Sequence, residues 1–542
     1  MSLQSRIFER ALKLPPPITR RITVTKDLRI PAYDGVELVA DLYEPRGVPN
    51  APTLLVRTPY GRNGLLSRLI HQSFAERGFT VLMATVRGTD GAGGEFAPFA
   101  DDQRDGLATL DWLEKQPWHN GKVVTFGASY LGYVQLAIAP DAGDRITALY
   151  PMIIGSNFAD VLYSGGSFLL GAALAWTART VTLERHSPLR ADVEEILGDK
   201  RAQKAMNHLP LSEAAELGTG KDVGFFGDWL VNNDPEQPYW KTERGHGDRV
   251  GEITAPTTFF GGWMDILVPG MLADYAAMRA AGRSPRLTVG PWAHVDFKQA
   301  GTAIPEAIAW FDAHVTGDTS ALRALPVRLH VGGADEWRDY PEYPPPGVAD
   351  TTLYLRPGGG LGSEPAREGA GRFTYDPADP TPTVGGPTLD PKSAGRKDNA
   401  KLEARPDVLV HTGDVLTQPW EVIGPVSARI SLRTGTGHAD VFVRLCDVDP
   451  KGRSINVCDG LQTITPQEHP ADDDGVRTVT VRMWPTAWRF KPGHRLRVQV
   501  SGGSFPQYAR NTGTGEPLAT AARTVKIDYE ILPGSGITLS TL

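Results

Sequence analysis

Cysteine is almost absent from this sequence, with only Cys446 and Cys458 among 542 residues. Two cysteines cannot form a disulfide framework or a four-ligand zinc site, and in a chain of this length they are more often buried thiols than a bonded pair. The N-terminus lacks the apolar run of a signal peptide, and no segment has the length and apolarity of a membrane span. We therefore expect a cytoplasmic protein with no membrane partner.

An excess of positive charge is also lacking, since 56 Lys and Arg residues stand against 63 Asp and Glu residues. A nucleic-acid partner normally requires a basic face, so no such partner is expected. The chain instead has the ordinary composition of a globular protein, with 41% hydrophobic and 22% charged residues. Its length is too great for a single core and suggests about two to four domains.

Strand and helix patterns alternate over residues 1–155 and again over residues 241–349. Two alternating runs, RITVTKDLRIP and GVELVADLYEP, predict antiparallel strands joined by a short turn. Apolar runs such as FTVLMATVRG predict buried strands, and helices are expected near residues 102–115 and 305–315. This alternation indicates a mostly parallel sheet with right-handed crossovers, which is the α/β class.

Two further regions differ in character. Strand signals vanish over residues 156–240, where GSFLLGAALAWTART and residues 189–207 are helical in pattern, so we predict an inserted helical cap. Residues 350–542 contain short alternating runs separated by turns, such as PVSARISLRTG and ADVFVRLCDVD, which predict a β-sandwich or jelly roll. Residues 4–14 are expected to form a docked N-terminal helix or, alternatively, a dimer arm.

The most informative stretch is KVVTFGASYLGYVQLAIA, residues 122–139. A β-branched run, two small residues, a serine and an apolar helix, expected to stop before Pro140, present Ser129 at the carboxyl end of a sheet. This is the pattern of a nucleophile elbow, where small neighbours allow a sharp turn. It departs from G-x-S-x-G, because Leu131 occupies the second position after the serine and the glycine is delayed to Gly132. A solvated serine in a tight turn is the alternative.

Two residues fit the order serine, acid, histidine that α/β-hydrolases use. Asp265 follows the predicted strand TTFFGGW and His294 follows the predicted strand RLTVG, so both lie where ligands gather, at the carboxyl ends of parallel strands. Of the 12 histidines, His294 is the one placed just beyond a sheet strand and downstream of such an aspartate. Because a serine hydroxyl needs a base oriented by a third group, we predict a triad of Ser129, Asp265 and His294.

The developing oxyanion needs hydrogen-bond donors. The backbone N–H of Tyr130 is one, since the residue after the nucleophile supplies it in this turn. No HGGG-type run follows an early strand, but Tyr60, in VRTPYGR, occupies the loop where the second donor is expected. Its phenol is protonated at neutral pH and can donate. From the residues alone, a partly buried surface tyrosine is the plainer interpretation of Tyr60.

Nearly the whole chain resembles the family of bacterial cocaine esterases, α-amino-acid ester hydrolases and X-prolyl dipeptidyl-peptidases. The resemblance rests on RTPYGR, VRGTDGAGGEF, DWLEKQPWHNGKVVTFGASYLG, FGGWMD, VGPWAH, YDPADP and FKPGHRLRVQVSGGSFPQY. It implies a serine hydrolase with an α/β-hydrolase domain (1–155 and 241–349), a helical cap (156–240) and a C-terminal jelly roll (350–542). Family members often form oligomers, so a homo-oligomer is one expectation.

The resemblance also implies roles for the residues that match its motifs. Ser129 would be the nucleophile, His294 the general base and Asp265 the residue that orients it. The Tyr130 amide and the Tyr60 hydroxyl would form the oxyanion hole. The delayed glycine, which departs from the common elbow pattern, is this family's own form of it.

Several functions are left open. An esterase acting on a small-molecule ester and an X-Pro dipeptidyl-peptidase or α-amino-acid ester hydrolase are both compatible with the motifs, whereas a silent carbohydrate-binding protein would lack a triad member. The run Ile266–Pro269, directly after Asp265, carries no charge to hold a substrate ammonium. This favours a neutral ester with an apolar or aromatic acyl group. A cap carboxylate such as Asp160 would change that expectation if it reached the site.

No cofactor or metal is expected. A metal centre is the weaker alternative, because no histidine joins the acidic cluster that would have to build it, and acidic residues at a helix start need no metal. The cluster consists of Asp90, Glu95, Asp101, Asp102 and Asp105.

Overall fold

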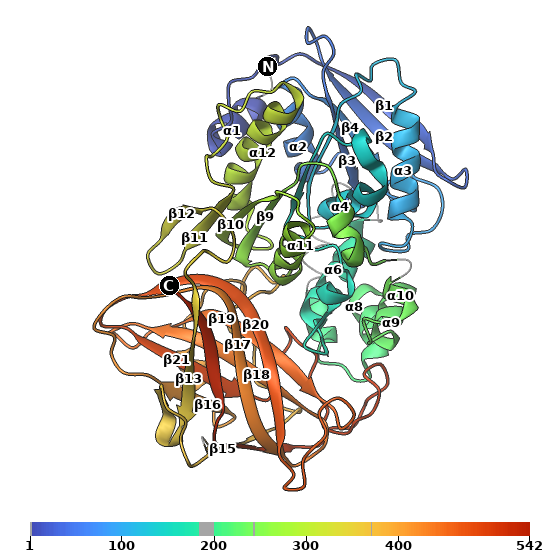
Figure 1. The fold of residues 1–542 in the computed structure, drawn as a ribbon. Coiled ribbons are helices and arrows are strands. Elements are labelled where there is room, and N and C mark those ends of the chain that lie inside the picture. Colours follow the sequence, from blue (N-terminus) through green and yellow to red (C-terminus); the bar gives the residue numbers. More distant parts are fainter. Residues whose placement is uncertain (1–2, 184–199, 242–243, 370) are drawn as a thin grey trace.

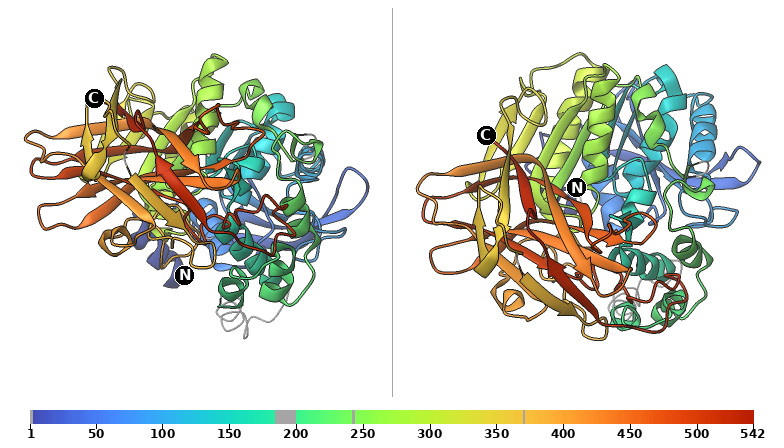
Figure 2. Two further views of the ribbon diagram at one scale, coloured as in Figure 1. Left: turned by 90° about the horizontal axis from the view of Figure 1, so that it is seen from below. Right: turned by 60° about the horizontal axis from the view of Figure 1, so that its bottom comes forward.

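Two large β-sheets organise the molecule, one in the N-terminal part and one in the C-terminal part (Figure 1). The computed structural model describes residues 3–183, 200–241, 244–369 and 371–542. Helices cover the first sheet, the second sheet lies against its lower end in this view, and a cluster of short helices sits beside the two (Figure 1, Figure 2).

The first sheet has ten strands. Its strands from β4 to β11 run parallel, and antiparallel strands flank them at both edges. Every residue of β3, β4 and β9 is buried, as a sheet covered on both faces requires. The predicted α/β sheet is therefore confirmed. In spatial order the strands are β1 (Ile22–Pro31), β2 (Glu37–Pro45), β4 (Thr80–Thr85), β3 (Thr53–Thr58), β5 (Val123–Ala128), β6 (Ala148–Met152), β9 (Thr258–Met264), β10 (Arg286–Ala293), β11 (Val327–Val331) and β12 (Glu336–Tyr340).

Helices cover both faces of this sheet. One group packs on one face and consists of α1 (Leu3–Leu12), α2 (Leu65–Ala75) and α12 (Ala300–Val315). The other group consists of α3 (Asp102–Leu113), α4 (Tyr130–Ala142) and α11 (Val268–Ala280). The N-terminal helix docks on its neighbours, because α1 packs against α2 and α12 and the Ser5 hydroxyl donates to Glu76 over 2.8 Å. The expected docked helix is confirmed.

Two helices contain prolines that the sequence analysis placed at or beyond their ends. The helix α4 continues through Pro140 to Ala142, so the expected stop before Pro140 was wrong, and α12 begins at Ala300, ahead of Pro305. A proline inside a helix removes one backbone hydrogen bond and crowds the preceding turn. Both helices are held by burial against the sheet, and this packing outweighs the local cost.

The helical insert lies between β6 and β9 in the chain. Its described helices are α5 (Ala159–Leu162), α6 (Leu170–Leu183), α8 (Ala214–Thr219), α9 (Gly224–Val231) and α10 (Pro238–Lys241). It also contains a short hairpin of β7 (Tyr163–Ser164) and β8 (Ser167–Phe168), so the expectation of no strand here was wrong. The hairpin is closed by two glycines with positive φ, which suits a two-residue turn. Of the helix predicted over 189–207, residues up to 199 lie outside the described part, and residues 200–205 are helical.

The second sheet forms a C-terminal β domain, as expected. Its strands pair antiparallel apart from one parallel bridge between β14 and β16. Buried and exposed residues alternate along much of β17, whereas every residue of β18 is buried. Cys446 and Cys458 are free and buried here. The strands are β13 (Ala349–Arg356), β14 (Gly360–Gly362), β15 (Gly371–Tyr375), β16 (Val408–Thr412), β17 (Trp420–Thr434), β18 (Ala439–Val448), β19 (Ser454–Ile464), β20 (Arg477–Phe490), β21 (Arg495–Ser501), β22 (Ile527–Ile531) and β23 (Gly536–Thr541), with the short helix α13 (Ala400–Glu403) between β15 and β16.

The β domain packs closely against both other parts of the molecule. Its strand β20 meets the first sheet, where Gly332 forms a bridge with Trp488. It meets the helical insert at Gly165, where a Cβ atom would lie 1.8 Å from the carbonyl oxygen of Leu461. Only a glycine fits at that contact, so the close packing of the insert on the β domain depends on Gly165.

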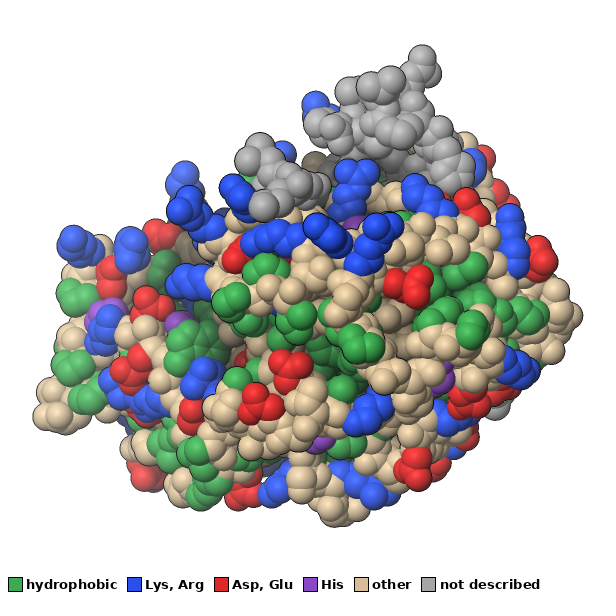
Figure 3. Space-filling view, turned by 90° about the horizontal axis from the view of Figure 1, so that it is seen from above, with side chains coloured by type: hydrophobic (Ala, Val, Ile, Leu, Met, Phe, Trp, Pro, Cys, Tyr) green, Lys and Arg blue, Asp and Glu red, His purple; other side chains and the backbone are tan. Residues whose placement is uncertain are grey.

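The outer surface carries charges of both signs. On the face seen from above, Lys and Arg side chains are interspersed with Asp and Glu side chains (Figure 3). Within the described part of the chain, every helix is too short or too polar to cross a lipid bilayer.

Candidate active site

Ser129 lies in a sharp turn between β5 and α4. Its backbone has φ 59° and ψ −124°, a left-handed conformation that is strained for a residue with a side chain. The Ser129 N–H donates to the carbonyl of Met152 over 2.9 Å, and its own carbonyl accepts from the amides of Gly132 and Tyr133 at 2.8 and 3.0 Å. These bonds fix the turn and leave the hydroxyl free to point out of it.

Two glycines beside Ser129 are required by close packing. A Cβ atom at Gly127 would lie 2.3 Å from the Cβ atom of Leu131, and one at Gly132 would lie 2.6 Å from Ile154 Cγ2. The glycine displaced to Gly132 therefore has a physical reason, since α4 passes directly over the chain that follows β6. The departure from G-x-S-x-G is a packing requirement of this elbow.

The structure brings Ser129, His294 and Asp265 into one hydrogen-bonded chain. Each follows the carboxyl end of a parallel strand, β5, β10 and β9 respectively. His294 Nε2 lies 3.1 Å from Ser129 Oγ, and His294 Nδ1 lies 2.9 and 3.2 Å from the two carboxylate oxygens of Asp265. The carboxylate accepts, so Nδ1 carries the proton and Nε2 is left to accept one from the serine.

Asp265 is held by its own loop and by the β domain. Its side chain is only 1% exposed, and the amide of Leu267 donates to its Oδ1 over 2.7 Å. The indole N–H of Trp484, on β20 of the β domain, donates to the Asp265 carbonyl over 3.0 Å. His294 is held in a similar way, because the side-chain amide of Gln299 donates to the backbone carbonyl of His294 over 3.1 Å. Asp265 and His294 are therefore fixed by contacts within the protein.

Tyr60 and Tyr130 both lie next to Ser129. Tyr130 is the first residue of α4, and the first amides of a helix have no acceptor within it. The Tyr60 hydroxyl is within hydrogen-bonding reach of the Ser129 side chain and accepts from the indole N–H of Trp176 over 3.0 Å. Burial raises the pKa of Tyr60, so its phenol keeps its proton and can donate it to an oxyanion.

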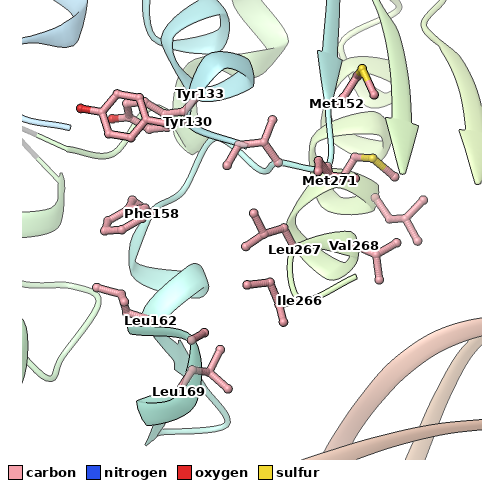
Figure 4. Packing of buried hydrophobic residues seen from close by; sticks show 14 of the residues in the cluster. Tyr130, Tyr133, Met152, Phe158, Leu162, Leu169, Ile266, Leu267, Val268 and Met271 are labelled. Carbon is pink, nitrogen blue, oxygen red and sulfur yellow. The ribbon is translucent and has the colours of Figure 1, made fainter. Parts of the chain in front are cut away.

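A small apolar cavity of about 50 Å³ opens beside Ser129 and His294. The residues around it come from all three parts of the chain, and several of its apolar walls are drawn in Figure 4. None of the described residues that line it is a carboxylate. Its apolar lining consists of Phe99, Tyr130, Ile154, Phe158, Val161, Leu162, Ala172, Ala173, Trp176, Trp229, Ile266, Leu267 and Leu389.

Most of these walls cannot be identified from the sequence. Trp176 lies in the apolar run GSFLLGAALAWTART, whose periodicity marks a buried face but not what that face covers. Leu389 comes from a loop of the β domain more than 250 residues after the serine, and nothing in the local sequence marks it. Asp160 does not line the cavity, and its carboxylate accepts from Asn157 over 3.0 Å. The expected neutral wall after Asp265 is present as Ile266 and Leu267.

Comparison with known proteins gives the chain its relatives. The X-Pro dipeptidyl-peptidase (S15 family) matches residues 34–296, and the X-Pro dipeptidyl-peptidase C-terminal non-catalytic domain matches residues 321–531. The chain is 33% identical to cocaine esterase of Rhodococcus sp. (strain MB1 Bresler), over 92% of this chain and 94% of that protein.

Two solved structures share the whole fold. An aminopeptidase from the marine sediment archaeon Thaumarchaeota archaeon has a TM-score of 0.83 at 22% identity and covers 97% of this chain and 98% of its own. An α-amino acid ester hydrolase has a TM-score of 0.80 at 20% identity, covering 98% of both chains. The family matches and the extent of the cocaine esterase similarity lead to one conclusion: this chain is a serine hydrolase of the X-Pro dipeptidyl-peptidase S15 family, to which cocaine esterase is also related.

Proposed function

We propose that this hydrolase cleaves neutral carboxylic esters of short apolar acids through an acyl-enzyme, with Ser129 as nucleophile. Ser129 Oγ attacks the ester carbonyl while His294 Nε2 takes its proton, and Asp265 stabilises the imidazolium that forms. His294 then gives that proton to the departing alkoxide, which leaves the acyl group on Ser129. Water repeats the sequence, with His294 as base, and releases the acid.

The oxyanion in both steps is assigned to two donors, the amide of Tyr130 and the hydroxyl of Tyr60. The amide is one of the unpaired donors at the start of α4, where the helix dipole also favours negative charge. Trp176 donates to the oxygen of Tyr60, so the phenol proton is directed elsewhere. Donors held in advance in a buried site need no reorganisation as charge develops.

The apolar, uncharged lining of the cavity is the observation that supports a neutral ester as substrate. A substrate with a free α-amino group would bring an ammonium next to apolar side chains without a carboxylate to pair it, and burying an unpaired charge is costly. The volume of about 50 Å³ is a third of the ~150 Å³ cavity that holds benzene in another protein. A short aliphatic acyl group therefore fits better than an aromatic one.

The test compares esters that differ in one feature. Rates of p-nitrophenyl butyrate, p-nitrophenyl 2-aminobutyrate and p-nitrophenyl benzoate are each divided by the hydroxide-catalysed rate of the same ester, because the amino ester is intrinsically more reactive. We expect butyrate to exceed the amino ester by up to about tenfold in kcat/KM at pH 7, because an α-amino group with a pKa of about 7.7–8.0 can enter the cavity as the neutral amine at a cost of about 1.4 kcal/mol or less. Benzoate and Ala-Pro-p-nitroanilide should be poorer substrates than butyrate. A preference for the aminated substrates would overturn the choice of substrate and leave the nucleophile standing.

A single substitution in the wall makes the test sharper. Leu267→Asp places a carboxylate in the cavity next to the acyl group. It should raise the relative rate of the amino ester and lower that of butyrate, whereas the matched Leu267→Asn, which is polar but uncharged, should lower butyrate without helping the amino ester. Equal effects of the two variants would mean that the charge of the wall does not set the preference.

A further inference from the structure

Carboxylates of the acidic cluster, residues 90–105, form ion pairs with arginines in the structure. Asp90 pairs with Arg62, and Asp105 pairs with Arg87 at 2.7 Å. Asp102 pairs with Arg57, whose guanidinium also donates to the Asp102 carbonyl over 2.6 Å. These contacts account for Asp90, Asp102 and Asp105 without a metal. One of them, Asp102, also touches the residue that follows the nucleophile.

The hydroxyl of Tyr130 is fully engaged inside the protein. It donates to Asp102 Oδ2 over 2.7 Å and accepts from the amide of Phe99 over 3.1 Å. The side chains of Arg57 and Asp102 are 1% and 4% exposed, and Tyr130 is 2% exposed. A hydroxyl with both partners in place and no access to water cannot rotate away, so the side chain of Tyr130 is locked at its far end.

The ring of Tyr130 is fixed as well. It stacks on Phe99 at 4.3 Å between centroids and lies parallel to Trp176 at 6.4 Å, with an interplanar angle of 4°. The ring of Tyr60 meets it edge-on at 6.5 Å. Tyr130 therefore affects both donors assigned to the oxyanion, since its own backbone carries one and its ring contacts the ring of Tyr60, which carries the other.

Stability alone does not explain the buried Arg57–Asp102 ion pair. Arg57 Nε is buried without a partner among the described residues, and a buried ion pair often contributes no more than a well-packed apolar pair. A Cβ atom at Gly106 would lie 2.4 Å from Ile138 Cγ2 and 2.5 Å from Arg57 Nη1, so this glycine makes room both for α4 and for the guanidinium. The chain keeps a charged pair, and a glycine opposite it, next to a tyrosine of the active site.

We propose that Asp102, backed by Arg57, is a positioning residue that acts through the Tyr130 hydroxyl to hold the Tyr130 amide at the oxyanion. The inference rests on the proposed function. A donor must lie about 2.7–3.1 Å from the oxyanion, and a displacement near 1 Å in an active site can cost about 10²-fold. The peptide that carries the Tyr130 amide belongs to a strained turn, so a side-chain anchor on that residue opposes relaxation of the turn.

The decisive variant is Tyr130→Phe, which keeps the amide and the ring and removes only the anchoring hydroxyl. We expect kcat for p-nitrophenyl butyrate, counted per Ser129 that a fluorophosphonate labels, to fall about tenfold, with KM changed less than about twofold. The affinity for a trifluoromethyl ketone, whose adduct with Ser129 carries an oxyanion, should fall by a similar factor. A merely structural role would lower the labelled fraction and leave both of these quantities unchanged.

Tyr133→Phe is the matched control. Tyr133 lies one turn further along α4, is equally buried, and donates to the carbonyl of Arg244 over 2.7 Å. Both variants lose a buried, hydrogen-bonded hydroxyl from the same helix, and both should lower the melting temperature. Only Tyr130→Phe should lower kcat. Equal kcat per labelled site in the two variants would overturn the proposal.

A double-mutant cycle tests whether Asp102 acts through Tyr130. Asp102→Asn removes the charge that faces Arg57 and Tyr130, and the double variant with Tyr130→Phe should fall no further in kcat than the worse single variant. Full additivity would remove Asp102 from the proposed unit. If the fluorophosphonate fails to label Ser129 in the unaltered protein, the proposed function itself fails; if it labels Ser129 and Tyr130→Phe matches the parent, only the positioning role fails.

Discussion

Two regions of this molecule bury charged side chains, and they do so with opposite outcomes. At the carboxyl edge of the first sheet, Asp265 is buried behind His294, and the chain of bonds ends on a serine hydroxyl that faces a cavity. At the centre of the β domain, Arg444 and Asp459 are both 0% exposed and 2.8 Å apart. There the bonds end on Asn399 and on backbone carbonyls of the loop before it.

The difference teaches that buried charge by itself does not mark an active site. Both clusters are buried and hydrogen-bonded, but only the first leads to a group that a small molecule can reach. The β-domain pair instead ties a loop to a strand. Function belongs to the place where buried polar groups converge on a cavity, and the predictions below separate the two regions by what each substitution damages.

Ser129→Ala should have the largest effect. Ester hydrolysis should fall by about 10⁵-fold or more, because the residues of a triad act as a unit and no other group can form the acyl-enzyme. The melting temperature should stay close to that of the parent. Retention of most activity by a purified Ser129→Ala sample would place the chemistry elsewhere.

Tyr60→Phe should have the next largest effect on the site. It deletes one oxyanion donor together with the acceptor of the Trp176 indole, and loss of one such donor typically costs about 10²–10³ in kcat. The KM for p-nitrophenyl butyrate should change little, since that bond forms mainly in the transition state. A variant with near-normal kcat would mean that the second donor is another group.

Arg444→Met tests the buried ion pair of the β domain. It leaves the Asp459 carboxylate buried without its partner, which typically costs about 3–5 kcal/mol of stability. We expect a clear drop in the melting temperature of the β domain in a calorimetric scan. The kcat per labelled Ser129 should stay within about threefold of the parent below that transition, and a much larger loss would show that this pair also serves catalysis.

The smallest expected effect comes from Asp440→Asn in the β domain. Burial raises the pKa of Asp440 to about 7, above the value near 3.9 of an unfolded chain. The folded protein therefore holds a proton there that the unfolded chain releases, and the stability from this group is full below about pH 4 and is lost as the pH rises towards 7.

The amide variant keeps an acceptor for Asn511, which donates to Asp440 over 2.9 Å, and removes the titration. Its melting temperature should exceed that of the parent by a few degrees at pH 8, and the difference should vanish near pH 4. Melting curves across this range measure it directly. A difference that is the same at both pH values would contradict the raised pKa of Asp440.

The sequence predicted the parts of the site that are set by local rules. A nucleophile elbow needs small residues around Ser129, and an acid and a base need the ends of two later strands, so all three positions can be found along the chain. The α/β sheet and the β domain follow from the periodicity of their strands. These features are local or repeat in sequence order. The structure agrees with both sheets and brings the three site residues together, and their catalytic roles stay predictions.

The rest depends on contacts between distant segments. The sequence predicts that the helix after Ser129 stops before Pro140. The helix α4 instead continues through Pro140, because burial against the sheet outweighs the local cost of the proline. Trp176 and Leu389 could not be assigned to the cavity, because the local sequence of the cap and of the β-domain loop does not show which part of the molecule each packs against. The acidic cluster is visible in the sequence, but two of its arginine partners, Arg57 and Arg62, lie 45 and 28 residues from the carboxylates that they pair with.

The indole of Trp484 and the side chain of Leu389 have a consequence for the order in which the protein becomes competent. The ribosome makes Ser129 early and these two residues late, and until they exist the carbonyl of Asp265 has no indole donor and the cavity lacks one wall. A nascent chain therefore carries the proposed nucleophile in an unfinished pocket. We expect hydrolytic competence only once the β domain has been translated and has docked.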